Sequence, residues 1–188
     1  CPVGQYQGGD GKEGCTPCAA GTFADIQGLQ VCKQCDVGTF NVNSGLTECT
    51  KCAAGHYQSA TGKIDCTVCA KGYVQPLVGK AACAICDVAT YAPTTGLTAC
   101  TECEVGKFQD QKGQDLCTAC AVGQYQPSKK MISCTHCSEG RYQNAREATA
   151  CIKCAKGRFG AASKLGESDP SYCQACVHGK FNPASGST

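Results

Sequence analysis

The residues of this 188-residue chain that could carry chemistry are its 21 cysteines. All but one lie in C-x-x-C doublets, and a pair at this spacing can act as a redox dithiol, bind zinc together with a second pair, or form disulfides with other cysteines. Ten doublets occur, at Cys15/Cys18, Cys32/Cys35, Cys49/Cys52, Cys66/Cys69, Cys83/Cys86, Cys100/Cys103, Cys117/Cys120, Cys134/Cys137, Cys151/Cys154 and Cys173/Cys176.

The context of the doublets separates these three chemistries. Redox catalysis needs a thiolate stabilised at the start of a helix, and no stretch here has the apolar periodicity of a helix. Zinc stays an alternative, because C-x2-C-x13-C-x2-C lies near the spacing of zinc ribbons. An unbroken, even array of doublets nevertheless gives no natural grouping into fours. The sequence favours disulfides, without metal or cofactor, and therefore an extracellular, cell-surface or secretory location.

Composition supports a scaffold held together by covalent cross-links. Cysteine makes up about 11% of the chain, above the roughly 8–10% that marks disulfide scaffolds. Leu, Ile, Val and Phe together number 27, about 14%, which is too few for an ordinary apolar core. We therefore expect no enzyme. The net charge of +2 also argues against binding to nucleic acid.

The cysteines define tandem repeats. Successive doublets are 17 residues apart eight times running and then 22 apart, so a five-residue insertion lies between Cys154 and Cys173. We interpret residues 1–188 as one continuous array and an internal fragment of a longer chain, with no membrane contact in this segment. The repeats begin at Cys1, Cys18, Cys35, Cys52, Cys69, Cys86, Cys103, Cys120, Cys137, Cys154 and Cys176.

Two other residue types keep the same phase when positions are counted from the first residue of each repeat. Glycine occupies position +3 in every repeat except the one with Ala89, and a second glycine at +10 recurs in eight repeats. An aromatic occupies +5 except at Val74, where Tyr73 comes one place early. We expect these aromatics to pack inside the array: Tyr6, Phe23, Phe40, Tyr57, Tyr91, Phe108, Tyr125, Tyr142, Phe159 and Phe181.

The spacing predicts a small β-hairpin in each repeat. The +3 glycine suggests a turn or a close backbone approach, the aromatic lies on a short extended arm, and the +10 glycine turns the chain towards a return arm before the next cysteine. The predicted fold class is small disulfide-rich and all-β. It is a linear solenoid rod of about eleven 17-residue hairpins with almost no helix.

Two disulfide patterns fit the count of cysteines. One joins each doublet to the next doublet and leaves Cys1 over. The other closes each repeat on itself and leaves Cys176 to pair with a cysteine beyond the fragment. The hairpin favours this second pattern, which has the pairs Cys1–Cys15, Cys18–Cys32, Cys35–Cys49, Cys52–Cys66, Cys69–Cys83, Cys86–Cys100, Cys103–Cys117, Cys120–Cys134, Cys137–Cys151 and Cys154–Cys173.

Few other residues invite a functional interpretation. His56, His136 and His178 fall in different repeats, which is typical of solvated loop residues. Six doublets read C-T-x-C, and threonine suits an extended segment, but exposed threonines could also carry O-linked glycans. The insertion before Cys173 predicts an enlarged loop, with a partner contact there as the alternative.

The pattern C-x-x-C-x-x-G-x-[FY]-x4-G-x3-C, seen from Cys32 through Cys49, resembles the ephrin-receptor-like cysteine-rich repeat. It is also similar to the first module of tumour necrosis factor receptor cysteine-rich domains, in which C-P-x-G-x-Y opens a loop as Cys1 to Tyr6 do here. The resemblance covers essentially the whole chain and implies loop-closing disulfides. Long uniform arrays of this kind look like the surface and coat proteins of protists.

Uniform repeats offer no singular pocket, so we expect an extracellular structural role. This would be a rod-like spacer, coat or filament component that associates with itself or with other rods. The alternative is a cell-surface receptor or adhesion ectodomain that binds a protein ligand, and a less favoured one is a zinc-binding cysteine array.

Overall fold

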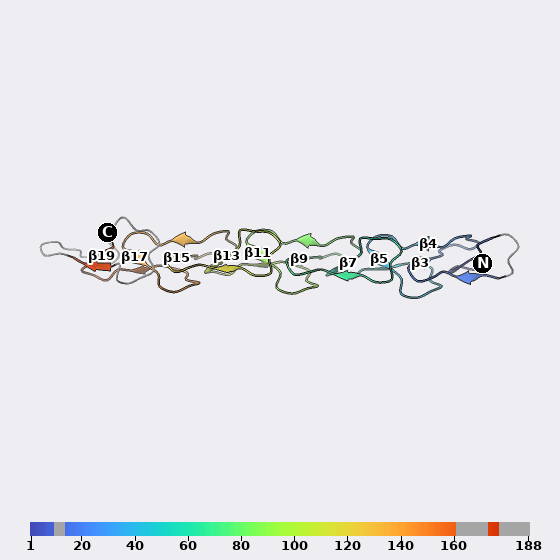
Figure 1. Cartoon of the computed structure of the whole chain (residues 1–188), viewed down its shortest axis with the longest axis horizontal. Helices are drawn as coiled ribbons and strands as arrows, with labels where there is room; N and C mark the ends of the chain where they lie inside the picture. The colour runs from blue at the N-terminus through green and yellow to red at the C-terminus, as the bar shows by residue number, and fades with distance from the viewer. Residues whose placement is uncertain (10–13, 161–172, 177–188) are drawn as a thin grey trace. The chain divides into compact units, whose positions relative to one another are not determined.

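The computed structural model describes residues 1–9, 14–160 and 173–176. In these ranges the chain has no helix and consists of short strands joined by turns and irregular segments (Figure 1). Every sheet has two antiparallel strands that follow one another along the chain. The predicted fold class is confirmed: the protein is a disulfide-rich, all-β array of hairpin repeats.

Each of the ten repeats that begin at Cys1 to Cys154 contributes one hairpin, and nearly all of the strands described are two residues long. The hairpins pair β1 (Gln5–Tyr6) with β2 (Thr16–Pro17), β3 (Thr22–Phe23) with β4 (Lys33–Gln34), β5 (Thr39–Phe40) with β6 (Thr50–Lys51), β7 (His56–Tyr57) with β8 (Thr67–Val68), β9 (Tyr73–Val74) with β10 (Ala84–Ile85), β11 (Thr90–Tyr91) with β12 (Thr101–Glu102), β13 (Lys107–Phe108) with β14 (Thr118–Ala119), β15 (Gln124–Tyr125) with β16 (Thr135–His136), β17 (Arg141–Tyr142) with β18 (Ile152–Lys153), and β19 (Arg158–Gly160) with β20 (Cys173–Ala175).

A tight turn starts each hairpin. In the first repeat the Gln5 amide donates to the Pro2 carbonyl, and Gly4, with φ +80°, occupies the third place of the turn. A type II turn requires positive φ there, which glycine adopts without a steric cost. The Cys18 amide then donates to the Gly4 carbonyl at 2.9 Å, which fastens the end of the repeat to its turn.

The return strand differs in position from the prediction. We expected it before the next doublet, but in most hairpins it is the two residues between the doublet cysteines, such as Thr50–Lys51. Once the disulfide has brought Cys35 beside Cys49, the strand at Thr39–Phe40 is level with the residues that follow Cys49 rather than those that precede it. The doublet is therefore itself part of the sheet.

The chain divides into two compact units. The first comprises Cys1–Cys86 and Ala92–Cys100, and the second comprises Asp87–Tyr91 and Thr101–Thr188. The inserted segment between Cys154 and Cys173 lies, for residues 161–172, outside the described residues.

Disulfide sulfur forms most of the buried core. The first residue of every repeat from Cys18 to Cys154 is fully buried, whereas the predicted packing aromatics that the structure describes are only half-buried. A small apolar cluster in the first unit joins Val74 and Ala92 to the Cys86–Cys100 bridge, with Leu97 against it. In the described ranges no helix is long and apolar enough to span a membrane.

Candidate functional site: the contact between repeats

Ten disulfides each close one repeat, with a sequence separation of 14 except in the last, where it is 19. Their Cα–Cα distances of 5.4 to 5.8 Å are ordinary for disulfides. Cys176 is unpaired and half-buried. The bridges are Cys1–Cys15, Cys18–Cys32, Cys35–Cys49, Cys52–Cys66, Cys69–Cys83, Cys86–Cys100, Cys103–Cys117, Cys120–Cys134, Cys137–Cys151 and Cys154–Cys173.

In six repeats a buried amide side chain at position +6 lies in the loop beside the disulfide. In the repeat that begins at Cys52, Gln58 Nε2 donates to the Asp65 carbonyl at 2.8 Å, and Gln58 Oε1 accepts from the Ala60 amide at 3.1 Å. One side chain thus satisfies a donor and an acceptor of the loop, which would otherwise be costly to bury. The same pair of bonds recurs at Gln75, Gln109, Gln126 and Gln143.

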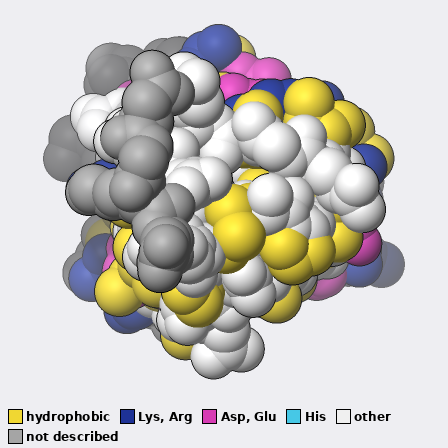
Figure 2. Space-filling view, turned by 90° about the vertical axis from the view of Figure 1, so that its right-hand side faces the viewer, with side chains coloured by type: hydrophobic (Ala, Val, Ile, Leu, Met, Phe, Trp, Pro, Cys, Tyr) yellow, Lys and Arg dark blue, Asp and Glu magenta, His cyan; other side chains and the backbone are white. Residues whose placement is uncertain are grey.

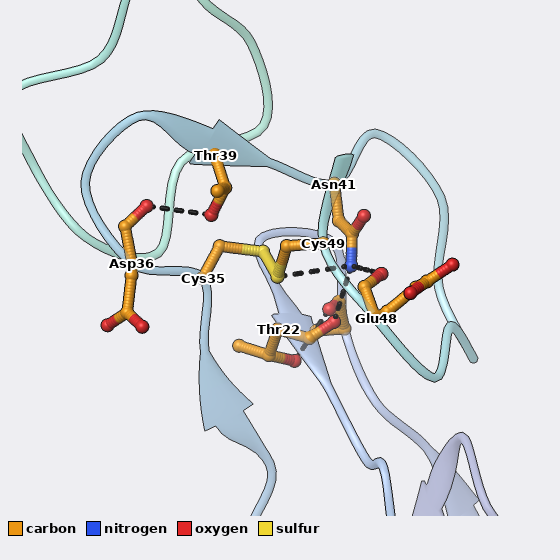
Figure 3. The surroundings of a disulfide bond; sticks show 8 residues. Thr22, Cys35, Asp36, Thr39, Asn41, Glu48 and Cys49 are labelled. Atoms are coloured by element: carbon orange, nitrogen blue, oxygen red, sulfur yellow. Dashed lines mark hydrogen bonds between the residues drawn. A yellow bond between two sulfur atoms is a disulfide. The ribbon is translucent and has the colours of Figure 1, made fainter. Parts of the chain in front are cut away.

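Asn41 fills the same position with a side chain one methylene shorter. Its Nδ2 donates to the Glu48 carbonyl at 3.0 Å and to the Thr22 carbonyl at 3.3 Å, and it lies 3.6 Å from Cys49 Sγ (Figure 3). Asn41 is 1% exposed, and within the described residues its Oδ1 has no hydrogen-bond partner. The shorter side chain therefore supplies the donor bonds to the loop but not the acceptor bond that glutamine makes.

Sequence reasoning missed this column. The sequence contains a signal for it, because +6 is Gln or Asn in most repeats.

Within each unit, backbone hydrogen bonds join consecutive repeats. The +3 amide of one repeat donates to the +6 carbonyl of the following repeat, and the +6 amide donates to the +11 carbonyl of that following repeat. In the opposite direction, the +10 amide of the following repeat donates to the carbonyl of the cysteine that begins the first repeat. All three groups belong to the main chain, so the contact tolerates different side chains. In the first unit an example is Gly21 to Asn41 (2.8 Å), Ala24 to Leu46 (3.1 Å) and Gly45 to Cys18 (2.7 Å); in the second it is Gly106 to Gln126 (2.8 Å), Gln109 to Met131 (3.1 Å) and Lys130 to Cys103 (2.8 Å).

The +3 glycine also meets the repeat after next. A Cβ built on Gly21 would overlap the carbonyl oxygen of Gly62, which is 41 residues further along, and would lie 2.8 Å from its carbonyl carbon. Backbone fills this space, so no side chain can move aside. The same approach recurs at Gly4, Gly38 and Gly55 in the first unit and at Gly106 in the second. The recurring +3 glycine thus allows close backbone contact across three consecutive repeats, which we call the glycine interlock.

The backbone contacts between repeats form a regular lattice, and at three of its positions with left-handed backbone conformation the residue is not glycine. Ala89 stands at +3 with φ +64°, and Lys130 and Glu147 stand at +10 with φ of +57° and +56°. The left-handed conformation costs L-residues about 1–2 kcal/mol. At +10 both side chains form ion pairs with residues two repeats earlier in the second unit, Lys130 with Glu102 at 3.0 Å and Glu147 with Lys107 at 3.4 Å.

The remaining ion pairs are also exposed. Lys129 lies 2.8 Å from Glu104, and Lys112 lies 2.6 Å from Asp87. The hydrogen bond from Lys129 to Glu104 raises the pKa of the lysine. The hydrogen bond from Lys33 holds the pKa of Asp25 below its usual value. Such solvated pairs contribute little to stability.

The histidines do not form a common site. His56 Nδ1 lies 3.3 Å from the Ala54 carbonyl oxygen, and His136 Nε2 lies 3.2 Å from Gln124 Nε2. His178 lies outside the described residues, as does the predicted packing aromatic Phe181. In the part of the chain that the structure describes, no three His, Cys, Asp or Glu side chains are grouped as metal ligands would be.

Apolar side chains are frequent on the surface. Val31 is 73% exposed, and Ile26 and Ile64 are each more than half exposed. On the face drawn in Figure 2, hydrophobic side chains lie among backbone and other uncharged atoms, with charged side chains towards its edges. This exposure follows from a core of sulfur and backbone, which leaves little interior for branched side chains.

Comparison with known proteins identifies the repeat. The search of curated proteins found no match to the chain. Four overlapping stretches, residues 21–63, 38–77, 89–130 and 106–149, match the family model described as tyrosine-protein kinase ephrin type A/B receptor-like. Together they span more than half of the sequence and follow the 17-residue period, with each stretch covering more than two repeats. The chain therefore belongs to the ephrin-receptor-like family and is an extracellular-type, disulfide-rich array of its cysteine-rich repeats.

Proposed function

We propose that this chain is a non-enzymatic, extracellular structural protein that reaches its site through the secretory pathway: a rod-like spacer, or a component of a coat or filament. The observation that supports this most directly is the uniform contact between repeats. In each unit the same main-chain bonds recur, and the glycine interlock occurs at Gly4, Gly21, Gly38 and Gly55 of the first unit and at Gly106 of the second. A lattice built from backbone can be extended by adding repeats, as solenoids are.

The disulfide pattern suits a protein under tension. Each disulfide connects the two ends of its loop, so the loop residues cannot extend when the chain is pulled. The length of a stretched repeat is then the 5.7 Å between the bridged Cα atoms plus the short segment that leads to the next repeat. Even with every hydrogen bond broken, one repeat would reach about 16 Å, whereas 17 unbridged residues would reach about 60 Å. A chain of such loops limits its own extension.

Electron microscopy of the protein from its native source tests the proposed role. We expect regular fibres or a lattice, with this array traceable inside them, made by self-association or by contact with other such chains. Discrete single molecules at native abundance would contradict an assembly role.

Force spectroscopy on the oxidised chain tests the tension argument separately. We expect a maximum extension per repeat close to the bridged value and a several-fold longer one after reduction. Equal extensions in the two states would contradict the argument.

A receptor or adhesion ectodomain is the second candidate. The family match favours it, because the description of the family refers to receptor tyrosine kinases. The two candidates differ in what they require of one repeat. A ligand site needs a singular feature, and the sequence offers the insertion between Cys154 and Cys173. Deleting the five inserted residues should abolish binding to a protein partner if the receptor proposal holds, and should leave fibre formation intact if the structural one does.

A further inference from the structure

Six threonines occupy one position of the repeat, directly after the first cysteine of a doublet. All six are exposed and lie on a strand. Each is directly opposite the +5 aromatic of its own hairpin, and side chains of such a pair stand on the same face of the ribbon. The pairs are Thr16 with Tyr6, Thr50 with Phe40, Thr67 with Tyr57, Thr101 with Tyr91, Thr118 with Phe108, and Thr135 with Tyr125.

The hydroxyls of these threonines are available. Among the described residues, none of the six has a hydrogen-bond partner for its Oγ1. A second set of threonines, at +4, provides the contrast. Thr22, Thr39 and Thr90 each donate their hydroxyl to the +1 carbonyl at 2.7 Å, as Figure 3 shows for Thr39 and Asp36. The same residue type is thus tied to the backbone in one column and free to react in the other.

The fold does not require threonine at the doublet position. Lys33, Ala84 and Ile152 occupy it in other repeats, and their strands keep the same register with the partner strand. A preference for β-branched residues explains Ile152 but not Lys33 or Ala84. Threonine is thus one of several residues that the strand accepts at this position, and the group that distinguishes it from the others is its hydroxyl.

The surface beside the pair is hollowed. In the first unit, a hollow of about 410 Å³ is lined by Tyr57 and Thr67 of one repeat and by Ala70, Tyr73 and Ala82 of the next. Tyr73 is the aromatic displaced from +5 to +4, and it is 38% exposed. A second hollow, of about 430 Å³, lies beside Tyr6 and Thr16. Hollows of this size are within the range of small-ligand sites.

A sugar fits this combination of groups. One face of a pyranose ring presents C–H groups that pack on an aromatic ring, and its hydroxyls point towards water, as an open hollow allows. A residue attached at Thr67 Oγ1 would lie beside the Tyr57 ring, since the two side chains share a face.

We propose that the doublet threonines are O-glycosylation sites, and that the sugar on Thr67 lies in the hollow against Tyr57. A nucleotide sugar is the donor. Threonine Oγ1 forms a bond to the anomeric carbon, the bond from that carbon to the nucleoside diphosphate breaks, and the hydroxyl proton passes to a base of the glycosyltransferase. The inference adds a modification to the proposed structural role but does not depend on it.

Peptide mapping of the protein from its native source tests the proposal, with electron-transfer fragmentation to locate each sugar. We expect sugar masses on the doublet threonines and none on the +4 threonines, which are an internal control in the same chain. Unmodified doublet threonines would overturn the proposal, and so would equal modification of Thr22, Thr39 and Thr90, because hydroxyl availability would then not decide the site.

The position of the sugar has its own test, nuclear Overhauser contacts measured on the intact glycoprotein. Protons of the sugar on Thr67 should show contacts to the ring protons of Tyr57. A sugar attached at Thr67 without such contacts would overturn its placement in the hollow.

Discussion

Replacing Gly21 with alanine should destabilise the array far more than a glycine-to-alanine change normally does. Gly21 has φ +80°, and its missing Cβ leaves room for the carbonyl of Gly62, two repeats away. The substitution therefore combines two effects, a left-handed backbone conformation and an overlap with main chain. A matched control in the same repeat separates them. Gly28 has φ +75°, but a Cβ there would have no atom within 4 Å.

The expected magnitudes differ accordingly. A left-handed alanine costs about 1–2 kcal/mol, and this is the whole expected effect of Gly28→Ala. Overpacking against a neighbour that cannot move costs about 1–3 kcal/mol more, so Gly21→Ala should lose about 2–5 kcal/mol. The added loss comes from separating repeats, which should also weaken the bonds from Gly21 to Asn41 and from Gly62 to Cys35.

Amide hydrogen exchange followed by mass spectrometry, with the disulfides kept oxidised, measures this repeat by repeat. In Gly21→Ala, protection should fall both around residue 21 and around residue 62. In Gly28→Ala, any loss should stay local. Equal losses of stability in the two variants, within about 0.5 kcal/mol, would refute the three-repeat interlock, because backbone conformation alone would then account for both.

Three other changes test further parts of the lattice. Ala89→Gly should raise the free energy of unfolding by up to about 1 kcal/mol, because relief of a left-handed alanine outweighs the added freedom of the unfolded chain; a lower melting temperature would contradict this. Asn41→Gln should raise the free energy of unfolding by about 1 kcal/mol, because glutamine supplies the missing acceptor bond. Gln58→Leu should lower it by about 2 kcal/mol or more, because a loop amide and a loop carbonyl are left unpaired. The denaturant midpoints of the two variants measure both effects. Reductant should abolish hydrogen-exchange protection throughout the array and a zinc chelator should not, and loss of structure on chelation would instead support a zinc array.

The sequence was most informative where a residue has a single physical use. Cysteine at 17-residue spacing indicated the repeat, and the low content of branched apolar residues indicated that disulfides replace a conventional core. Glycine at +3 indicated a turn or a close approach, and in the structure Gly21 serves both purposes, since it lies in a tight turn and against the Gly62 carbonyl.

Other features could not be deduced because they depend on distances between repeats. No local pattern shows that position +3 meets a residue 41 places further on, or that the return strand lies within the doublet rather than before it. Sulfur and the buried +6 amides occupy the interior, and rings such as Tyr57 are half-buried at the edge of a hollow. Residue type alone does not reveal which of two adjacent columns faces inward.

The lattice also explains where this array can vary. Its main contacts are made by backbone and by the cysteine, glycine and amide columns, so a change at +4 or +9 leaves them intact. The +10 position shows the limit of that tolerance: Lys130 and Glu147 accept a strained conformation, and their exposed ion pairs offset at most about 1 kcal/mol of it. Charge at +10 therefore reduces stability on balance.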